Sequence, residues 1–117
     1  MDSQVIIDPA VYRELKDQVG ADFLMELIDT YNLETSELIE KLRQALAVKD
    51  TASFGRLAHS IKSSSASLGA LVFSQQAREL EILGKANDLS DAGPKLERMA
   101  AGFLQVKRCL EELRDEP

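Results

Sequence analysis

The sequence has little of what small proteins use to cross-link or interrupt a chain. Its 117 residues include one cysteine, three prolines, six glycines and no tryptophan. A single cysteine excludes an internal disulfide, and because Cys109 lies in a helical pattern we expect it to be a small apolar filler. Scarce glycine and proline suit an all-helical chain, since both residues are unfavourable inside helices.

Features of nucleic-acid-binding, membrane and secreted proteins are also missing. The net charge of −6 argues against nucleic acid as a partner, because binding to phosphates needs a broad basic surface. No apolar run approaches membrane-spanning length, and the N-terminus lacks the basic region of a signal peptide. With 44% hydrophobic and 29% charged residues, the composition is that of a soluble globular protein. We expect one domain over residues 1–117, monomeric and located in the cytoplasm.

Apolar residues recur at helical spacing along most of the chain. The spacing predicts helices over about 9–19, 22–48, 51–69, 71–86 and 94–113. The inward face of the helix 71–86 is expected to hold Phe73, Ala77, Leu80, Leu83 and Gly84, and its other side Arg78, Glu81 and Lys85. The helix 94–113 is expected to form an apolar seam of Leu96, Met99, Phe103, Val106, Leu110 and Leu113. No alternation typical of strands interrupts these helices. Four long helices with short connections favour an all-α fold, an antiparallel up-down-up-down four-helix bundle, with the short additional N-terminal helix lying across one end.

Capping residues set the expected helix boundaries. Asp8, directly before a proline, is a typical helix start, and residues 1–7 are then a lead-in segment. Asp22 is expected to cap the long helix that follows. Either Asp50 or Thr51 is expected to cap the next helix.

The one histidine of the chain lies on the outer face of the predicted helix 51–69. At about 100° per residue, His59 points roughly 180° away from the apolar side of that helix. Lys62 and Ser63 follow it by three and four positions, while Arg56 and Gly55 precede it by the same intervals. The buried side is expected to hold Phe54, Leu57, Ala58, Ile61, Ser64, Ser65 and Leu68.

Several chemistries need more than this chain offers. Di-iron bundles use paired Glu-x-x-His motifs, and zinc needs three or four ligands, so one histidine and one cysteine predict no metal site. Ser60 and Ser63 lie near His59, but no nucleophile elbow accompanies them, and no glycine-rich loop predicts a nucleotide site. A single exposed histidine can still carry a phosphoryl group, because a neutral imidazole has a free lone pair near pH 7.

Residues 58–69 read Ala-His-Ser-Ile-Lys-Ser-Ser-Ser-Ala-Ser-Leu-Gly. This string resembles the signature of the histidine-containing phosphotransfer (HPt) domain of multistep phosphorelays. That signature is alanine-histidine, any residue, an aliphatic, lysine, glycine, serine, a small residue, two variable positions, an aliphatic and glycine. The clear departure is Ser63, which stands where the family usually has glycine.

The resemblance implies a phosphoryl carrier rather than an autonomous enzyme. His59 would accept the group on Nε2 from the aspartate of a receiver domain, or from a kinase domain, and pass it to another receiver aspartate. The partner receiver would supply a bound magnesium ion. Lys62 would screen the phosphoryl oxygens, and Glu81 matches the family's glutamine or glutamate that bonds Nδ1 of the histidine. The alternative for Glu81 is a surface ion pair with Lys85.

A docking receiver would cover the helix face around the histidine. On this face we expect Gly55, Arg56, Ser63 and Ala66 to contact the partner, while Lys85 adds positive potential or is simply solvated. Two other hypotheses remain open. Ser63 would favour a degenerate bundle that only docks a protein, and the chain could be one domain of a larger kinase, although Met1 and a complete bundle suit a free-standing protein.

Overall fold

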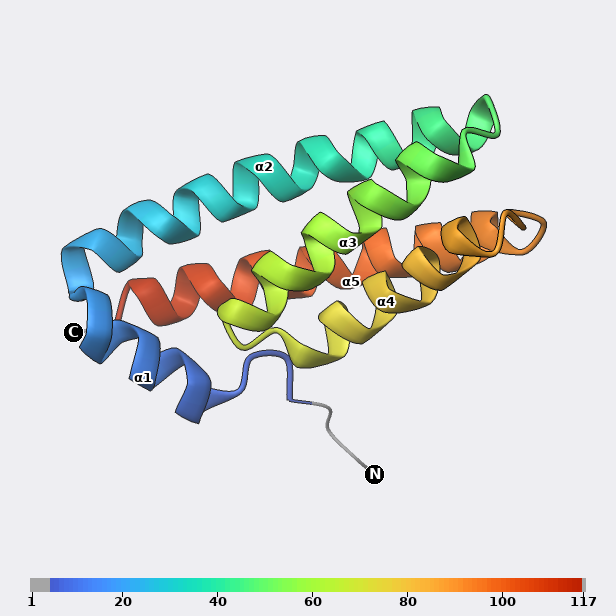
Figure 1. The fold of residues 1–117 in the computed structure, drawn as a ribbon. Helices are drawn as coiled ribbons and strands as arrows, with labels where there is room; N and C mark the ends of the chain where they lie inside the picture. Colours follow the sequence, from blue (N-terminus) through green and yellow to red (C-terminus); the bar gives the residue numbers. More distant parts are fainter. Residues whose placement is uncertain (1–4, 117) are drawn as a thin grey trace.

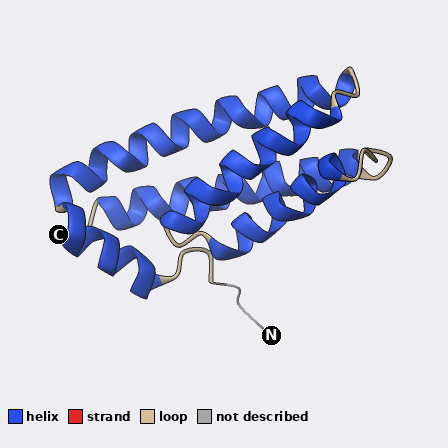
Figure 2. Ribbon diagram, viewed as in Figure 1, coloured by secondary structure: helices blue, strands red, loops and turns tan. Residues whose placement is uncertain are grey.

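The computed structural model describes residues 5–116, so the part of the expected lead-in segment that falls on residues 1–4 lies outside the described residues. Within that range the chain forms five helices and no strand (Figures 1 and 2). They are α1 (Pro9–Val19), α2 (Ala21–Ala47), α3 (Thr51–Ser67), α4 (Leu71–Lys85) and α5 (Ala92–Arg114). The predicted all-α fold is confirmed.

Helices α2 to α5 run alternately up and down and form an antiparallel four-helix bundle (Figure 1). Helix α1 lies across one end, near the turn between α3 and α4. The closest packing in the bundle is between α3 and α4. Among the described residues, no helix combines the length and the apolar character that crossing a membrane requires.

The core consists of apolar stripes that the four long helices turn toward one another. The stripe of α5 is the predicted one: Leu96, Met99, Phe103, Val106 and Leu110 are buried, and Leu113 is half-buried. Phe103 places its ring 6.3 Å from that of Tyr31 on α2 and 5.8 Å from that of Phe73 on α4. Cys109 is half-buried against this core, as expected for an apolar filler, and burial raises the pKa of its thiol.

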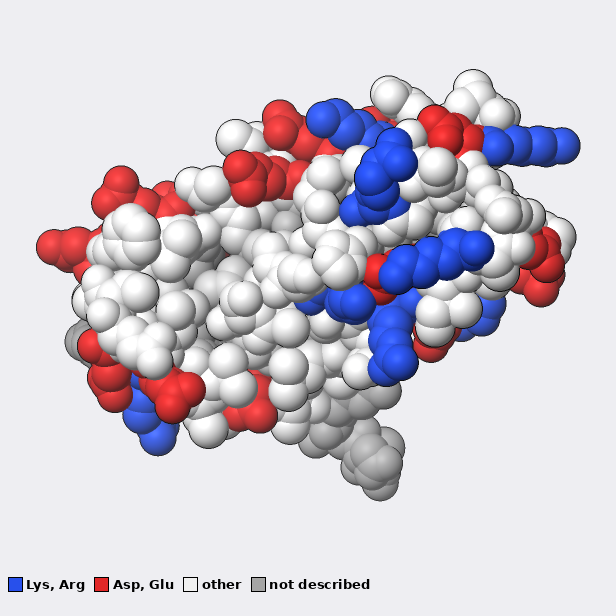
Figure 3. Space-filling view, viewed as in Figure 1, with Lys and Arg blue, Asp and Glu red and all other residues white. Residues whose placement is uncertain are grey.

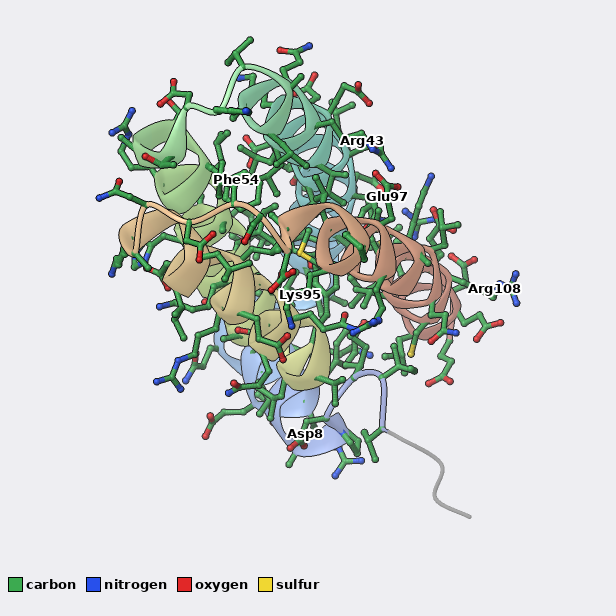
Figure 4. All side chains as sticks on the ribbon, turned by 90° about the vertical axis from the view of Figure 1, so that its right-hand side faces the viewer. Asp8, Arg43, Phe54, Lys95, Glu97 and Arg108 are labelled. Carbon is green, nitrogen blue, oxygen red and sulfur yellow. The ribbon has the colours of Figure 1, made fainter. Side chains whose placement is uncertain are left out.

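Polar contacts fix the pairing of α2 with its neighbours. Arg43 donates to both carboxylate oxygens of Glu97 on α5, at 3.0 and 2.9 Å, and the two side chains point toward one another in Figure 4. Tyr31 and Ser65 of α3 share a buried hydrogen bond of 2.7 Å, and burial raises the pKa of Tyr31 to about 12. A two-point Arg–carboxylate contact is directional, so it favours one register between α2 and α5.

Two of the predicted caps are present and one is wrong. Asp8 accepts from the backbone N–H groups of residues 10 and 11, and Asp50 accepts from that of Ser53 at 3.1 Å. The Thr51 hydroxyl is not a cap but donates to Asn87 at 2.9 Å. Asp22 does not cap α2, because that helix begins at residue 21, directly after Gly20. Gly20 (φ 87°) both ends α1 and occupies the N-cap position of α2. A glycine has no side chain that could cap the helix.

The segment before α1 is more than a lead-in. Ile7 is buried in the core, and the N–H of Asp8 donates to the carbonyl of Gly69 at 2.8 Å. This bond fastens the start of α1 to the α3–α4 turn. Gly69 has φ +88°, and a Cβ there would lie 3.1 Å from the carbonyl oxygen of Asp8.

We therefore expect Gly69→Ala to lower the free energy of unfolding by about 1 to 3 kcal/mol, because alanine is strained at positive φ. Gly93→Ala is the matched control, since its Cβ would meet nothing within 4 Å. Urea unfolding followed by circular dichroism measures both variants. Equal free energies of unfolding for the two variants would show that the backbone conformation of Gly69 is not unfavourable for alanine.

Candidate functional site

His59 on α3 and Glu81 on α4 form the centre of the site. The ring nitrogen Nδ1 lies 2.7 Å from Oε2 of the carboxylate. The histidine side chain is 56% exposed, whereas that of Glu81 is only 4% exposed. Helical periodicity had placed Glu81 on the outer side of α4, and this was wrong: the carboxylate lies between the two helices, with the imidazole above it toward solvent.

Two lysines complete the environment of this carboxylate. Lys62 donates to Oε1 at 2.7 Å, and Lys85 lies 3.1 Å from Oε2. The surface ion pair with Lys85 and the bond to the histidine are thus both present. The hydrogen bond from Lys62, aided by those from the histidine and Lys85, lowers the pKa of Glu81 to about 2 in spite of its burial.

An ionised Glu81 determines which nitrogen of the ring carries the proton. A carboxylate can only accept hydrogen bonds, so Nδ1 must be the donor. In the neutral imidazole the lone pair then belongs to Nε2, for which the described residues provide no hydrogen-bond partner. His59 therefore presents a nucleophilic nitrogen to solvent in a fixed orientation.

The side chain of Lys62 makes a contact that the sequence did not predict. It was expected to face a phosphoryl group, but here its ammonium is bonded to Glu81 and its side chain is 29% exposed. An ammonium has three N–H donors. It can therefore keep one N–H on the carboxylate and offer another to an oxygen of a group bound to Nε2.

The site opens into a hollow of about 420 Å³ whose rim includes His59, Arg56 and Lys85. Figure 3 shows lysine and arginine side chains gathered over α3 and α4 on this face, whereas acidic side chains are prominent along α2 and at the α1 end. Glu81 contributes one negative charge against the two of opposite sign from Lys62 and Lys85. The site is thus positive within a protein whose net charge is −6.

Comparison with known proteins shows the family of this chain. Residues 26–116 match the family model of the Hpt domain. The chain belongs to the Hpt domain family. The crystal structure of histidine-containing phosphotransfer protein B (HptB) from Pseudomonas aeruginosa is similar, with a TM-score of 0.89, 27% sequence identity and 96% of each chain covered. No curated protein sequence gives a significant match.

The outer face of this Hpt domain contains most, but not all, of the residues expected there. Arg56 and Ser63 are exposed, and Ala66 is half-buried. Gly55 is buried, which corrects the expectation that it contacts a partner, because it packs against Gly84 of α4. Ser64, expected on the buried side, is exposed and donates to the carbonyl of residue 60 at 3.0 Å.

The sequence did not predict Ser74 as part of the site, and it predicted only a packing role for Gly84. Ser74 of α4 is buried and donates to the backbone carbonyl of Lys62 at 2.8 Å. Gly84 had been assigned to the apolar face of α4 alone. The available signal was spacing, since Ser74, Ala77, Glu81 and Gly84 follow one another by three, four and three positions and are all buried.

The lowered pKa of Glu81 predicts a pH-dependent contribution to stability. An unfolded glutamate titrates near 4.5, so the stabilisation by the folded carboxylate is present above that pH and is lost as pH falls toward 2. We expect Glu81→Gln to be less stable than the wild type by about 1 to 3 kcal/mol at pH 7.

Urea unfolding between pH 7 and pH 2 measures this difference, which should shrink below pH 4.5. Glu79→Gln is the matched control, because Glu79 is 56% exposed and pairs with Lys95 only at 3.6 Å. A Glu81→Gln deficit that stays constant down to pH 2 would contradict the assigned ion pairs.

Proposed function

We propose that His59 is the residue that carries the phosphoryl group in this phosphorelay protein. Membership in the Hpt family establishes histidine phosphotransfer as the function of the domain. The observation that selects the residue is simple: His59 is the only histidine among the 117 residues. Its exposed side chain and the orientation of its ring support the same assignment.

The proposed step is a direct transfer from a phosphorylated aspartate of a receiver domain. The lone pair on Nε2 of His59 attacks phosphorus, the Nε2–P bond forms, and the P–O bond to the aspartate breaks. The electron pair of that bond leaves with the aspartate carboxylate. The reverse sequence of events passes the group to the aspartate of a second receiver. Such transfers depend on in-line positioning and on charge neutralisation more than on covalent chemistry.

Glu81 supports the change of charge on the ring. While Nε2 forms its bond to phosphorus, Nδ1 keeps its proton, so the imidazole gains positive charge. That charge lies 2.7 Å from the ionised carboxylate, which stabilises it. Glu81 therefore orients the nucleophile before transfer and stabilises the phosphorylated ring afterwards.

Lys62, Lys85 and Arg56 are proposed to serve the phosphoryl oxygens and the approach of the partner. A phosphoryl group brings a charge of about −1.5 to −2. The positive surroundings of Glu81 offset part of it. A receiver has an acidic, magnesium-binding pocket, so the cations on this face also favour its docking.

The receiver supplies what the carrier does not. Its magnesium ion would neutralise charge on the phosphoryl oxygens, and its aspartate is the other end of the transfer. We propose that the Hpt domain binds no nucleotide itself. No observation favours the alternative of a bundle that only docks a partner, since the histidine, its orienting carboxylate and the nearby lysines are all in place.

The first test is His59→Gln. We expect complete loss of label when the variant is incubated with a phosphorylated receiver domain, because no other histidine is present. Stability should fall by no more than about 1 kcal/mol, since the side chain is more than half exposed and only one hydrogen bond is removed. In the wild type the label should be acid-labile and alkali-stable. Labelling retained in the variant would reject His59.

A second test concerns the docking surface around His59. Ser63→Gly restores the glycine usual in the family and removes only an exposed side chain, so transfer should be unchanged or faster. Ala66→Trp places a large ring seven residues from the histidine on the same face and should block transfer from a receiver at unchanged fold. Normal transfer in Ala66→Trp would show that receivers dock elsewhere.

A further inference from the structure

Small residues lie at several points where α3 and α4 contact each other. On α4, the buried residues with a contact to α3 are Ser74, Glu81 and Gly84. On α3, the buried residue closest to Gly84 is Gly55. Small side chains allow two helix backbones to approach closely. Glu81 is the one long and charged residue among these buried ones, and its carboxylate lies at this narrow interface.

Gly84 is a position at which the backbones of the two helices come very close. A Cβ built on it would lie 2.7 Å from both Cα and N of Gly55, and 3.0 Å from the carbonyl oxygen of Thr51. The reverse is not true. A Cβ on Gly55 would lie 3.7 Å from the nearest atoms of α4, an ordinary van der Waals distance. Any side chain at Gly84 would therefore meet backbone, which cannot rotate away as a side chain could.

This close contact lies one helical turn from the catalytic pair. Gly84 follows Glu81 by three residues, and Gly55 precedes His59 by four. On the other side of the pair, Ser74 is two turns before Glu81 on α4 and donates to the carbonyl of Lys62, three residues after the histidine. The hydrogen bond between His59 and Glu81 is thus enclosed by a backbone contact on one side and by a side-chain-to-backbone bond on the other.

We propose that Gly84 and Ser74 are positioning residues for phosphotransfer, which act through Glu81 by fixing the distance between α3 and α4. The inference rests on the proposed role of His59. The hydrogen bond from Nδ1 is 2.7 Å long and spans the two helices, so its length depends directly on their separation. The buried carboxylate has little freedom to follow a moving ring.

The size of the effect follows from the geometry. Relieving a 2.7 Å contact to an ordinary 3.4 Å requires the helices to separate locally by roughly 3.4 − 2.7 = 0.7 Å. The same displacement would lengthen the bond between Nδ1 and the carboxylate beyond the usual limit of about 3.2 Å. Without that bond, the proton is free to occupy either nitrogen, and the nucleophilic form with its lone pair on Nε2 is no longer selected.

The experiment compares Gly84→Ala with Gly55→Ala. Both substitutions add one methyl group to a helix at the same interface, but only the first meets backbone at 2.7 Å. Nitrogen-15 NMR of the imidazole reports the fraction of the form protonated on Nδ1. Phosphoramidate serves as a small phosphoryl donor that needs no protein docking: its P–N bond breaks, the Nε2–P bond forms, and ammonia leaves.

We expect Gly84→Ala to lose the preference for the Nδ1-protonated form and to be phosphorylated about 10- to 100-fold more slowly. Gly55→Ala should resemble the wild type in both measurements. In the background of Glu81→Ala, Gly84→Ala should cause no further loss, because the residue it acts through is gone. The proposal would be overturned if Gly84→Ala left the Nδ1-protonated fraction of the imidazole unchanged. It would also be overturned if the double variant were phosphorylated more slowly than Glu81→Ala.

Ser74→Ala keeps the proposal testable if Gly84→Ala does not fold. It adds no atoms and removes only the bond to the carbonyl of Lys62, so the same two measurements should change in the same direction by a smaller factor. If the Nδ1-protonated fraction in Ser74→Ala equals that of the wild type, the proposed roles of Ser74 and of the helix spacing are overturned. The NMR measurement does not depend on phosphorylation. If the variants change the Nδ1-protonated fraction but the wild type is never phosphorylated on His59, the proposed function is rejected and the effect of helix spacing on the ring still holds.

Discussion

A buried carboxylate is the constraint around which this bundle is organised. Removing an ionised glutamate from water is unfavourable by several kcal/mol unless hydrogen bonds and opposite charges replace the water. Glu81 has three such partners, two on α3 and one on α4. Their presence requires α3 and α4 to lie close together in one register. The residues proposed to act in phosphotransfer are thus also the ones that make the burial of Glu81 tolerable.

Much of the fold could be predicted from the sequence, because apolar spacing reports helices directly. The stripe of α5 and the capping of α1 by Asp8 are both local properties of the chain, and both were predicted correctly. The errors lie where two elements meet. Asp22 does not cap α2 because α1 and α2 share Gly20, and Ile7 joins the core because its neighbour Asp8 is bonded to the α3–α4 turn. Neither contact leaves a periodic trace in the sequence.

In the site, too, properties of a single helix could be predicted from the sequence, whereas properties that depend on the packing of two helices could not. The exposure of His59 follows from its position opposite the apolar stripe, and its partnership with Glu81 was suggested by family resemblance. Periodicity alone placed Glu81 on the surface, since an acidic residue is ordinarily solvated. Its burial depends on how closely α3 and α4 approach, and that distance depends on whether Gly84 meets backbone or empty space. Such information exists only after the helices have been packed.

Under the proposed function, the charges of the site would let the carrier work in both directions without moving a proton. Glu81 remains ionised above about pH 2, so Nδ1 stays the donor throughout the physiological range. In the proposed transfer, only the lone pair on Nε2 takes part in bond making and breaking. With Lys62 and Lys85 bonded to the same carboxylate, the ring is oriented while positive charge remains available to the phosphoryl oxygens. In this proposal, no step in the carrier favours one direction by acid or base catalysis, so the direction of transfer would depend on the relative stability of the phosphorylated partners.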